Sequence, residues 1–179
     1  MIPQFIASGD LKDISAVKQN ANYHFEDIFA STLELLQDGD ALYGLPFSTP
    51  PVMIFYNKNL FDQHGLKTPK QLYQEGNWTY DEFLKAARTI ADVPNGIYGV
   101  NMISNWNSWS DNLLPIFWSY GADLFDETGT KFMLNTEAGR QALQLFYDMI
   151  FVDKVHPKPG DQVVFEAGKL GMFRGIYSN

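Results

Sequence analysis

Apolar residues follow two different patterns along this chain, and each pattern predicts a different kind of element. Val52–Asn57 is a short, continuous apolar run, which is typical of a strand buried on both faces of a sheet. Ile97–Asn101 has the same character, and Leu170–Phe173 also resembles a strand. We expect these three segments to be strands of one sheet.

Helical periodicity, with an apolar residue at every third or fourth position, marks two longer segments. The first covers residues 80–91 and follows a capping box formed by Thr79 and Glu82. The second covers residues 136–150, and its inward-facing positions are Ala142, Phe146, Met149 and Ile150. We expect both helices to pack on the faces of the predicted sheet.

Two shorter stretches also suggest helices. Apolar residues between Phe25 and Leu36 recur at helical spacing, and Gly39 would end that helix. Residues 163–170, VVFEAGKL, resemble a short helix before the last predicted strand. Because predicted strands and helices alternate along the chain, the predicted fold class is α/β.

Composition and charge exclude several classes of partner. The 179 residues carry a net charge of −8, whereas nucleic acid and anionic membrane surfaces require a basic face. No apolar run approaches the roughly 18 residues of a membrane span. The N-terminus lacks the basic and apolar regions of a signal peptide, and the chain has no cysteine for disulfides or thiolate metal sites. We therefore expect no nucleic-acid partner and no direct membrane insertion.

Motifs for catalysis and cofactor binding are absent from the sequence. The chain contains no G-x-S-x-G, H-E-x-x-H or G-x-G-x-x-G, and the Gly168-Lys169 pair lacks the rest of a phosphate-binding loop. The three histidines, His24, His64 and His156, are far apart and lie in polar stretches, so we expect them at the surface. No cofactor and no metal site is predicted, although a single sequence leaves a metal site or a Ser-His-Asp triad open.

Aromatic residues make up 15% of the chain, and five of them lie within the 15 residues from Trp106 to Tyr120. Trp118 fits a buried helix face, so core packing is expected there. Trp106 and Trp109 precede that helix and lie among amides, hydroxyls and the carboxylate of Asp111. Flat rings beside such groups suit a neutral polyol, because rings pack on the C–H faces of a sugar and polar groups bind its hydroxyls. The alternative is a helix start that is packed by indole rings.

A characteristic order of short motifs fills residues 41–91, which read ALYGLPFSTPPVMIFYNKNLFDQHGLKTPKQLYQEGNWTYDEFLKAARTIA. This stretch resembles the extracellular solute-binding proteins of bacterial ABC sugar importers, the maltose-binding type. Two later stretches match further landmarks of that family in the same order, PIFWSYGADLFDETGTKFMLNTEAGRQAL and FEAGKLGMFRG. The resemblance runs from about Ile2 to the last residue.

The resemblance implies a partial class II periplasmic-binding-protein fold, in which crossing strands join two α/β lobes and the ligand lies between the lobes. Residues 1–44 would be the C-terminal part of lobe 1, residues 45–51 the hinge crossing, and residues 52–179 most of lobe 2. Prolines suit such a crossing, because they fix φ and remove donors that would lack partners, so the strand should begin at Val52. The alternative is a loop without a hinge role. We expect this fragment to bind sugar weakly or not at all.

The family's binding positions carry over onto three segments: the approach to the PIFW helix, the hinge crossing and the end of the chain. The predicted ligand-binding residues are therefore Trp106, Trp109, Asp111, Ser48, Thr49, Pro50, Tyr177 and Ser178. The family's sugar-stacking tryptophan is missing near the C-terminus, where Ser178 stands at its position and Tyr177 precedes it. Trp78 matches a packing tryptophan of the family, so we expect it to be buried and outside the site.

The resemblance also implies a function. A non-enzymatic receptor would bind a carbohydrate, an oligosaccharide, and deliver it to ABC transporter permease subunits by lobe closure. It would act at the extracellular face or in the periplasm of a bacterium, with a lipid anchor in the full-length protein. One alternative is a receptor for another solute such as a polyol phosphate, for which Arg174 is the basic group near the suspected cleft. A glycoside-processing enzyme would need a carboxylate partner for Asp111. A purely structural α/β domain would use its rings as core.

Overall fold

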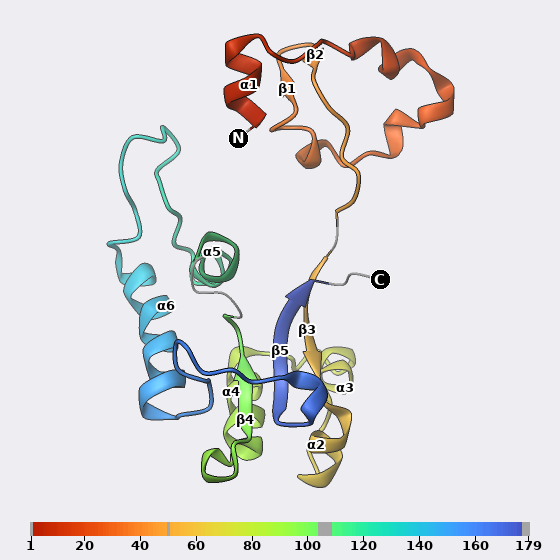
Figure 1. The fold of residues 1–179 in the computed structure, drawn as a ribbon. Coiled ribbons are helices and arrows are strands. Elements are labelled where there is room, and N and C mark those ends of the chain that lie inside the picture. Colours follow the sequence, from red (N-terminus) through yellow and green to blue (C-terminus); the bar gives the residue numbers. More distant parts are fainter. Residues whose placement is uncertain (1, 50, 104–108, 177–179) are drawn as a thin grey trace. The chain divides into compact units, whose positions relative to one another are not determined.

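The computed structural model of the chain describes residues 2–49, 51–103 and 109–176, and the side chains of residues 109–111 are not described. The chain divides into two compact units, Met1–Pro51 (unit 1) and Val52–Asn179 (unit 2). Figure 1 colours unit 1 from red to orange and unit 2 from yellow to blue. The boundary falls at the end of the proline-rich segment, directly before the first strand of unit 2.

Unit 1 consists of short elements. Helix α1 covers Ile2–Ser8, and the strands β1 (Gln37–Asp38) and β2 (Ala41–Leu42) form a small antiparallel hairpin. Between α1 and β1 the chain forms four short 3-10 segments, at Ser15–Gln19, Ala21–Tyr23, Phe25–Asp27 and Ala30–Thr32. Asp13 joins the first of these turns to the hairpin, because its Oδ1 accepts from the backbone nitrogens of Ser15 and Leu42 at 2.8 and 3.2 Å. A hydrogen bond from the Ser15 hydroxyl, together with these two backbone hydrogen bonds, holds the pKa of the Asp13 carboxyl below its ordinary value.

The helix predicted between Phe25 and Leu36 is wrong, because this segment forms separate 3-10 turns. An amphipathic helix gains most of its stability from burying its apolar face. Phe29 is 73% exposed, and among the described residues of unit 1 only Leu33 and Leu42 are buried. The apolar spacing is therefore present in the sequence, but the packing that would stabilise a helix is missing.

Unit 2 contains the predicted three-stranded sheet. Its strands are β3 (Val52–Tyr56), β4 (Tyr98–Asn101) and β5 (Leu170–Ile176), in the order β3-β5-β4. The central strand β5 is antiparallel to β3 and parallel to β4. β3 begins at Val52 as predicted, but its expected burial on both faces is wrong. Val52 and Met53 are 51% and 38% exposed, and the other three residues of β3 are only partly buried.

The helices of unit 2 begin where the sequence supplies caps. α2 (Lys58–Gln63) and α3 (Pro69–Gln74) follow β3, and a complete capping box of Thr68 and Gln71 opens α3. α4 (Tyr80–Ile90) begins after Thr79, whose hydroxyl accepts from the backbone nitrogen of Glu82 at 3.3 Å. The predicted helix over residues 80–91 is thus confirmed, and Thr79 is its cap.

The remaining helices belong to the second half of unit 2. α5 covers Trp109–Ser119, and α6 covers Glu137–Tyr147 and continues as a π-helical turn over Asp148–Val152. The helix predicted over residues 136–150 is confirmed. Two 3-10 turns occupy Val93–Asn95 and Phe165–Ala167. A short helix was predicted over residues 163–170, and only the second of these turns forms there.

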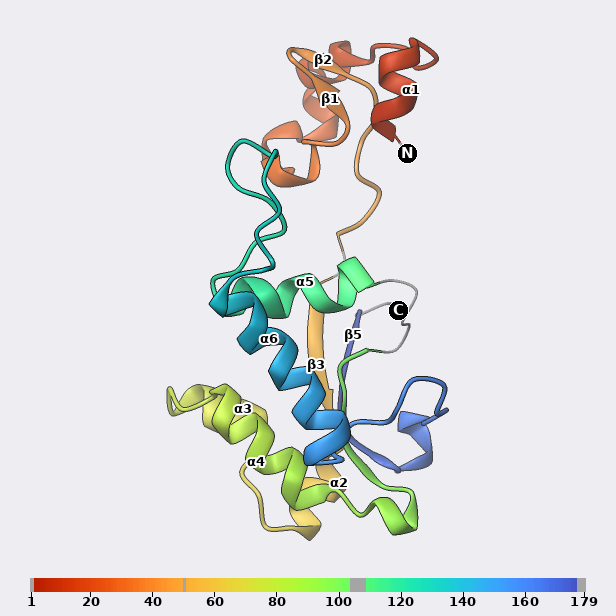
Figure 2. The ribbon, with the colours of Figure 1, turned by 90° about the vertical axis from the view of Figure 1, so that its left-hand side faces the viewer.

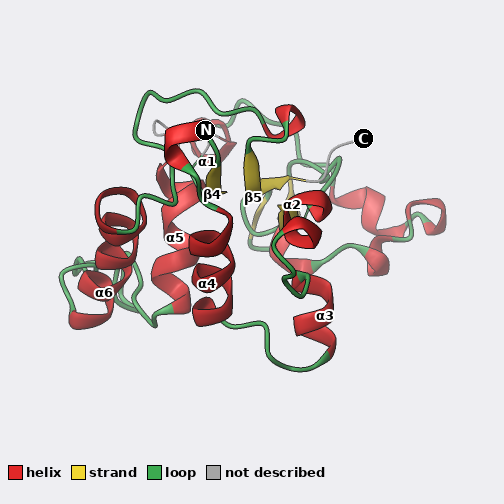
Figure 3. Ribbon diagram, turned by 90° about the horizontal axis from the view of Figure 1, so that it is seen from below, coloured by secondary structure: helices red, strands yellow, loops and turns green. Residues whose placement is uncertain are grey.

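Helix α4 lies directly on the sheet at two glycines. A Cβ atom on Gly99 of β4 would lie 2.0 Å from the carbonyl oxygen of Ala87, and one on Gly171 of β5 would lie 3.0 Å from side-chain carbons of Ile90. Ala87 and Ile90 are buried there together with Val100. Figures 2 and 3 show α4, α5 and α6 grouped on one side of β4, where α5 also contacts α6.

Candidate functional site

The parallel strands β4 and β5 end at the same edge of the unit 2 sheet. Their register pairs Val100 with Met172 and Asn101 with Phe173. The last residue of β4, Asn101, therefore lies opposite Phe173, and Arg174 is the next residue along β5. We call this region, with Asn101 and Arg174, the carboxyl edge. Ligands of open α/β sheets bind outside the carboxyl ends of the strands, because the connections that follow the strands diverge there. The carboxyl edge is therefore the first place in unit 2 to look for a site.

A hydrogen bond joins this edge to helix α5. Arg174 Nη1 donates to Asn112 Oδ1 at 3.2 Å. Asn112 is 6% exposed and lies one turn into α5, and Arg174 is half-buried on β5. This hydrogen bond to an amide oxygen orients the half-buried guanidinium, whose planar fork sets the directions of its N–H donors.

A hollow of about 260 Å³ opens beside the carboxyl edge. Its lining combines an amide, a guanidinium, a carboxylate and apolar groups: Asn101, Arg174, Glu166, Val163, Val164, Phe165, Leu170 and Phe173. The ring of Phe173 stacks on Phe55 with centroids 4.9 Å apart and meets Phe165 at 4.7 Å. Hydrogen-bonding groups beside half-buried rings are what a polyhydroxylated ligand requires, since its hydroxyls and its C–H faces need different partners.

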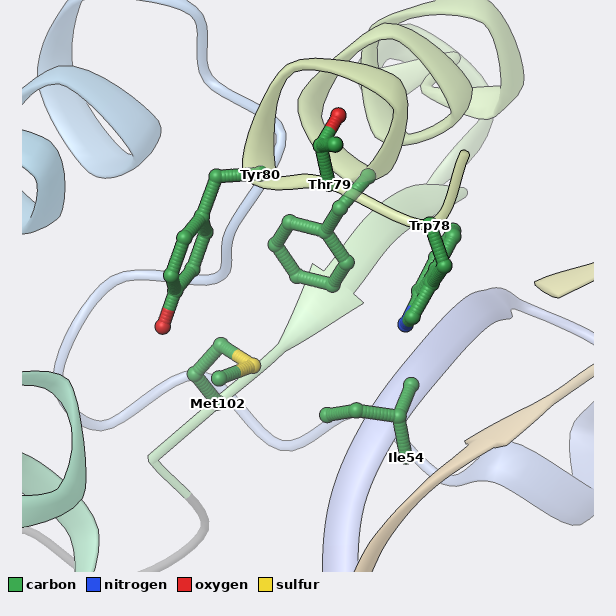
Figure 4. A pocket seen from close by; sticks show the side chains of 6 residues that line it. Ile54, Trp78, Thr79, Tyr80 and Met102 are labelled. Atoms are coloured by element: carbon green, nitrogen blue, oxygen red, sulfur yellow. The ribbon is translucent and has the colours of Figure 1, made fainter. Parts of the chain in front are cut away.

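A second pocket, of about 250 Å³, lies between the start of α4 and the sheet, and Figure 4 shows its lining side chains. It is lined almost entirely by apolar and aromatic groups: Ile54, Trp78, Thr79, Tyr80, Phe83 and Met102. This pocket offers neither a charged group nor an amide side chain among those residues. It therefore matches the needs of a sugar less well than the hollow at the carboxyl edge.

Two of the predicted site residues lie at the start of α5. The helix begins at Trp109, and Asp111 directly precedes Asn112, the partner of Arg174. The backbone thus brings Trp109 and Asp111 onto the helix that is tied to the carboxyl edge, while their side chains lie outside the described part of the structure.

The other predicted site residues receive less support. Ser48 and Thr49 are exposed, lie outside any helix or strand, and belong to unit 1. The remaining four predicted residues are outside the described residues, namely Trp106, Pro50, Tyr177 and Ser178. Their contribution to a site stays a prediction.

Two tryptophans differ from the sequence-based expectation. Trp118 was expected in the core, but it is 54% exposed and its Nε1 donates to Asp123 Oδ1 at 3.0 Å. This bond lowers the pKa of the Asp123 carboxyl. Trp78 is only partly buried, meets the ring of Phe83 edge-on at 6.1 Å and lines the apolar pocket. Trp118 was expected to share the buried face of the helix with Phe117, which is 2% exposed. Adjacent residues on a helix point in different directions, so the burial of Phe117 does not extend to Trp118.

His156 is a buried residue that the sequence analysis wrongly placed at the surface. It is 1% exposed, and its Nε2 accepts from the backbone nitrogens of Met102 and Ile103 at 2.9 and 3.3 Å. Burial lowers the pKa of the imidazole from 6.5 to about 4, so the ring is neutral near pH 7. Its polar neighbours in the sequence, VHPKPGD, gave no signal of this burial.

Metal binding and membrane insertion find no support in the described parts of the chain. Within residues 2–49, 51–103 and 109–176, no group of three or more His, Cys, Asp or Glu side chains could hold a metal ion. Across the same described ranges, none of the helices combines the length and the apolar character needed to span a bilayer.

Curated relatives resemble this chain over most of its length. The arabinooligosaccharide-binding protein of Halalkalibacterium halodurans is 26% identical over 150 residues, which are 79% of this chain and 30% of that protein. The sn-glycerol-3-phosphate-binding periplasmic protein UgpB of Pectobacterium atrosepticum is 28% identical over 151 residues, 80% of this chain and 33% of that protein. The chain thus spans about a third of the length of the curated relatives that it matches.

A solved structure shows the same fold. The ABC substrate-binding protein Lmo0181 from Listeria monocytogenes, in complex with cycloalternan, superposes with a TM-score of 0.80 at 22% identity. The superposition covers 97% of this chain and 44% of that protein. At this identity the similarity establishes the fold, and it confirms the predicted partial class II periplasmic-binding-protein architecture.

The sequence model of one family covers almost the whole chain. It describes the bacterial extracellular solute-binding proteins and matches residues 1–176. The fold, the curated relatives and this match agree with the order of motifs in the sequence. The chain therefore belongs to the bacterial extracellular solute-binding protein family.

Proposed function

We propose that the protein containing this chain binds a neutral carbohydrate, an oligosaccharide, and delivers it to the permease of an ABC transporter. The observation that carries the proposal is the carboxyl edge, where an oriented guanidinium, an amide and half-buried rings lie beside the start of α5. The names of an arabinooligosaccharide-binding relative and of a structure bound to cycloalternan support the choice of ligand class.

In this proposal the rings and the polar groups have separate tasks. Trp109 and Asp111, at the start of α5, would add an indole face and a carboxylate to the groups of Asn101 and Arg174. Sugar C–H faces would pack on rings, while hydroxyls would exchange hydrogen bonds with the amide, the carboxylate and the guanidinium. Binding of this kind requires no chemical step, so we propose a receptor and not an enzyme.

Residues 1–44 would then be the end of lobe 1, residues 45–51 the hinge crossing and residues 52–179 most of lobe 2. A ligand that binds more tightly between closed lobes shifts the population toward the closed form, which the permease would engage.

The place of action would be the extracellular face or the periplasm of a bacterium, with a lipid anchor on the full-length protein. The family description and the regular structure that begins at Val52 support this assignment.

A polyol phosphate is the second candidate ligand, because the relative from Pectobacterium atrosepticum is named for sn-glycerol-3-phosphate. Arg174 is the basic residue that lines the hollow at the carboxyl edge. A phosphate would draw on that charge, whereas a neutral sugar needs only its directed N–H groups.

Calorimetric titration of the complete gene product tests the proposal. The ligands are maltotriose, an arabinotriose, mannitol and sn-glycerol-3-phosphate, each titrated at low and at high salt. We expect saturable binding of a neutral oligosaccharide with little dependence on salt. Tight binding of sn-glycerol-3-phosphate alone, weakened by salt, would favour the second candidate, and the absence of binding to all four would reject the proposal.

A further inference from the structure

His156 fixes the backbone at the point where the chain leaves β4. Nε2 of the imidazole accepts from the backbone nitrogens of Met102 and Ile103, the two residues that follow the strand. Both residues are buried, with exposed fractions of 5% and 3%. Buried backbone N–H groups without an acceptor are strongly unfavourable, so the imidazole supplies what the end of the strand requires.

The bonding pattern determines the tautomer of this ring. A nitrogen that faces two N–H donors carries no proton, so the proton of the neutral ring must be on Nδ1. Nδ1 lies 2.7 Å from the carbonyl oxygen of Pro157 and donates to it. The ring is therefore held from both sides, by its own segment through Nδ1 and by the exit of β4 through Nε2.

The same segment also pairs with β4 itself. The carbonyl oxygen of Val155 accepts from the backbone nitrogens of Gly99 and Val100 at 2.9 and 3.0 Å. Just beyond the strand, the backbone nitrogen of Ile103 donates to Asn101 Oδ1 at 3.2 Å as well as to His156. The N–H of Ile103 is thus shared between the imidazole and the side chain of Asn101, which lines the hollow at the carboxyl edge.

We propose that His156 is a positioning residue of the carbohydrate site, which fixes the exit of β4 and thereby the amide of Asn101. The inference rests on the proposed function, since it assigns a task within that site. His156 would not touch the ligand. Its contribution is the orientation of Asn101 and of the backbone at Met102 and Ile103, because groups that bind a ligand lose affinity when their supporting contacts are removed.

Two polar substitutions of different reach separate positioning from general stability. In His156→Gln the side-chain amide reaches about as far as Nε2, so its oxygen can accept from Met102 and Ile103. In His156→Asn the amide reaches only as far as Nδ1, so Met102 loses its acceptor and Ile103 keeps Asn101 Oδ1 alone. Ile90→Ala serves as the stability control, because Ile90 is 1% exposed and packs under β5, away from the hydrogen bonds of His156.

The experiment measures two quantities for each variant of the complete gene product. Calorimetric titration with maltotriose and an arabinotriose gives the affinity, and NMR gives the amide-exchange rates of Met102 and Ile103. We expect His156→Asn to weaken sugar binding by about tenfold or more and to speed exchange at Met102 by about tenfold, with a smaller change at Ile103, which keeps Asn101 Oδ1 as an acceptor. His156→Gln should stay within about threefold of wild type in both measurements. Ile90→Ala should unfold at lower temperature, yet bind the sugar with unchanged affinity.

The outcomes distinguish this inference from the proposed function. Wild-type affinity in His156→Asn, or an equal loss in Ile90→Ala, would overturn the positioning role. If the wild-type protein binds no carbohydrate, the proposed function fails, while slow amide exchange and a proton on Nδ1 would still show the His156 contact. If His156→Asn does not fold, the test uses the wild type and His156→Gln instead. The amide-exchange rates of Met102 and Ile103 in both proteins, and the position of the ring proton in the wild type, then test the positioning role. A proton on Nε2 at neutral pH, or rapid exchange at Met102 and Ile103, would then contradict the inference.

Discussion

The Cα of Gly99 on β4 lies so close to Ala87 on α4 that an added Cβ would be 2.0 Å from the Ala87 carbonyl oxygen. Gly99→Ala should therefore force the helix and the strand apart, because the atom in the way is backbone and cannot rotate aside. We expect a loss of roughly 3 kcal/mol in the free energy of unfolding, at the upper end of typical overpacking. Urea unfolding followed by circular dichroism measures it.

Gly44→Ala is the matched control for this prediction. The nearest atom to a Cβ at Gly44 is Leu36 Cδ2 at 3.3 Å, the far end of a flexible side chain. We expect a change of less than about 1 kcal/mol there. Equal effects of the two substitutions would show that α4 does not pack on β4 as closely as described.

The lowered pKa of His156 predicts a dependence of stability on pH. Burial lowers the pKa from 6.5 to about 4, so the unfolded chain takes up a proton at a higher pH than the folded chain. The contribution is complete above pH 6.5 and is lost as the pH falls toward 4. The expected slope is about 1.4 kcal/mol per pH unit within that window. Urea unfolding at about pH 7.5, 6 and 5 measures it.

His156→Gln should remove this part of the slope between about pH 6.5 and 5, because glutamine does not titrate. A wild-type slope that persists in His156→Gln would contradict the assignment to the buried imidazole.

The sheet and two of its helices were predictable from the sequence, because their signals are local. Continuous apolar runs marked β3, β4 and β5, and a strong helical period marked α4 and α6, with Thr79 as the predicted cap of α4. The helix expected near Phe25 failed for the opposite reason. Its spacing was helical, but spacing does not reveal whether a partner surface is present, and Phe29 remains exposed.

The candidate site was only partly predictable. Residue types and motif order indicated the start of α5, where Trp109 and Asp111 lie. The pair formed by Arg174 and Asn112 joins residues 62 positions apart, and no local pattern predicts such a contact. His156 was missed because burial of a polar residue depends on hydrogen bonds to a distant strand end, which its own neighbours in the sequence do not indicate.

Arg174→Met separates the two candidate ligand classes. For a neutral sugar, the loss of directed N–H donors should weaken binding by about tenfold, the range of one hydrogen bond to a charged group. For sn-glycerol-3-phosphate the loss should be several hundredfold, because the substitution removes the charge that pairs with the phosphate. Calorimetric titration of wild type and variant with each ligand, at two salt concentrations, gives both numbers.

Arg174→Lys completes that comparison, because it keeps the positive charge and loses the planar fork that bonds Asn112. A neutral sugar should bind Arg174→Lys almost as weakly as Arg174→Met. Recovery of most of the affinity in Arg174→Lys would indicate a ligand that is held by charge, against our proposal.

The most direct test of a carbohydrate site at the start of α5 is the affinity of Trp109→Ala beside that of Trp118→Ala. Both tryptophans belong to α5, and Trp118, which is 54% exposed at the far end of the helix, is the matched control. The complete gene product is titrated calorimetrically with the tightest-binding oligosaccharide. We predict that Trp109→Ala weakens binding by about 2 kcal/mol, roughly thirtyfold, and that Trp118→Ala stays within about twofold of wild type. Wild-type affinity in Trp109→Ala, or equal losses in the two variants, would contradict the account.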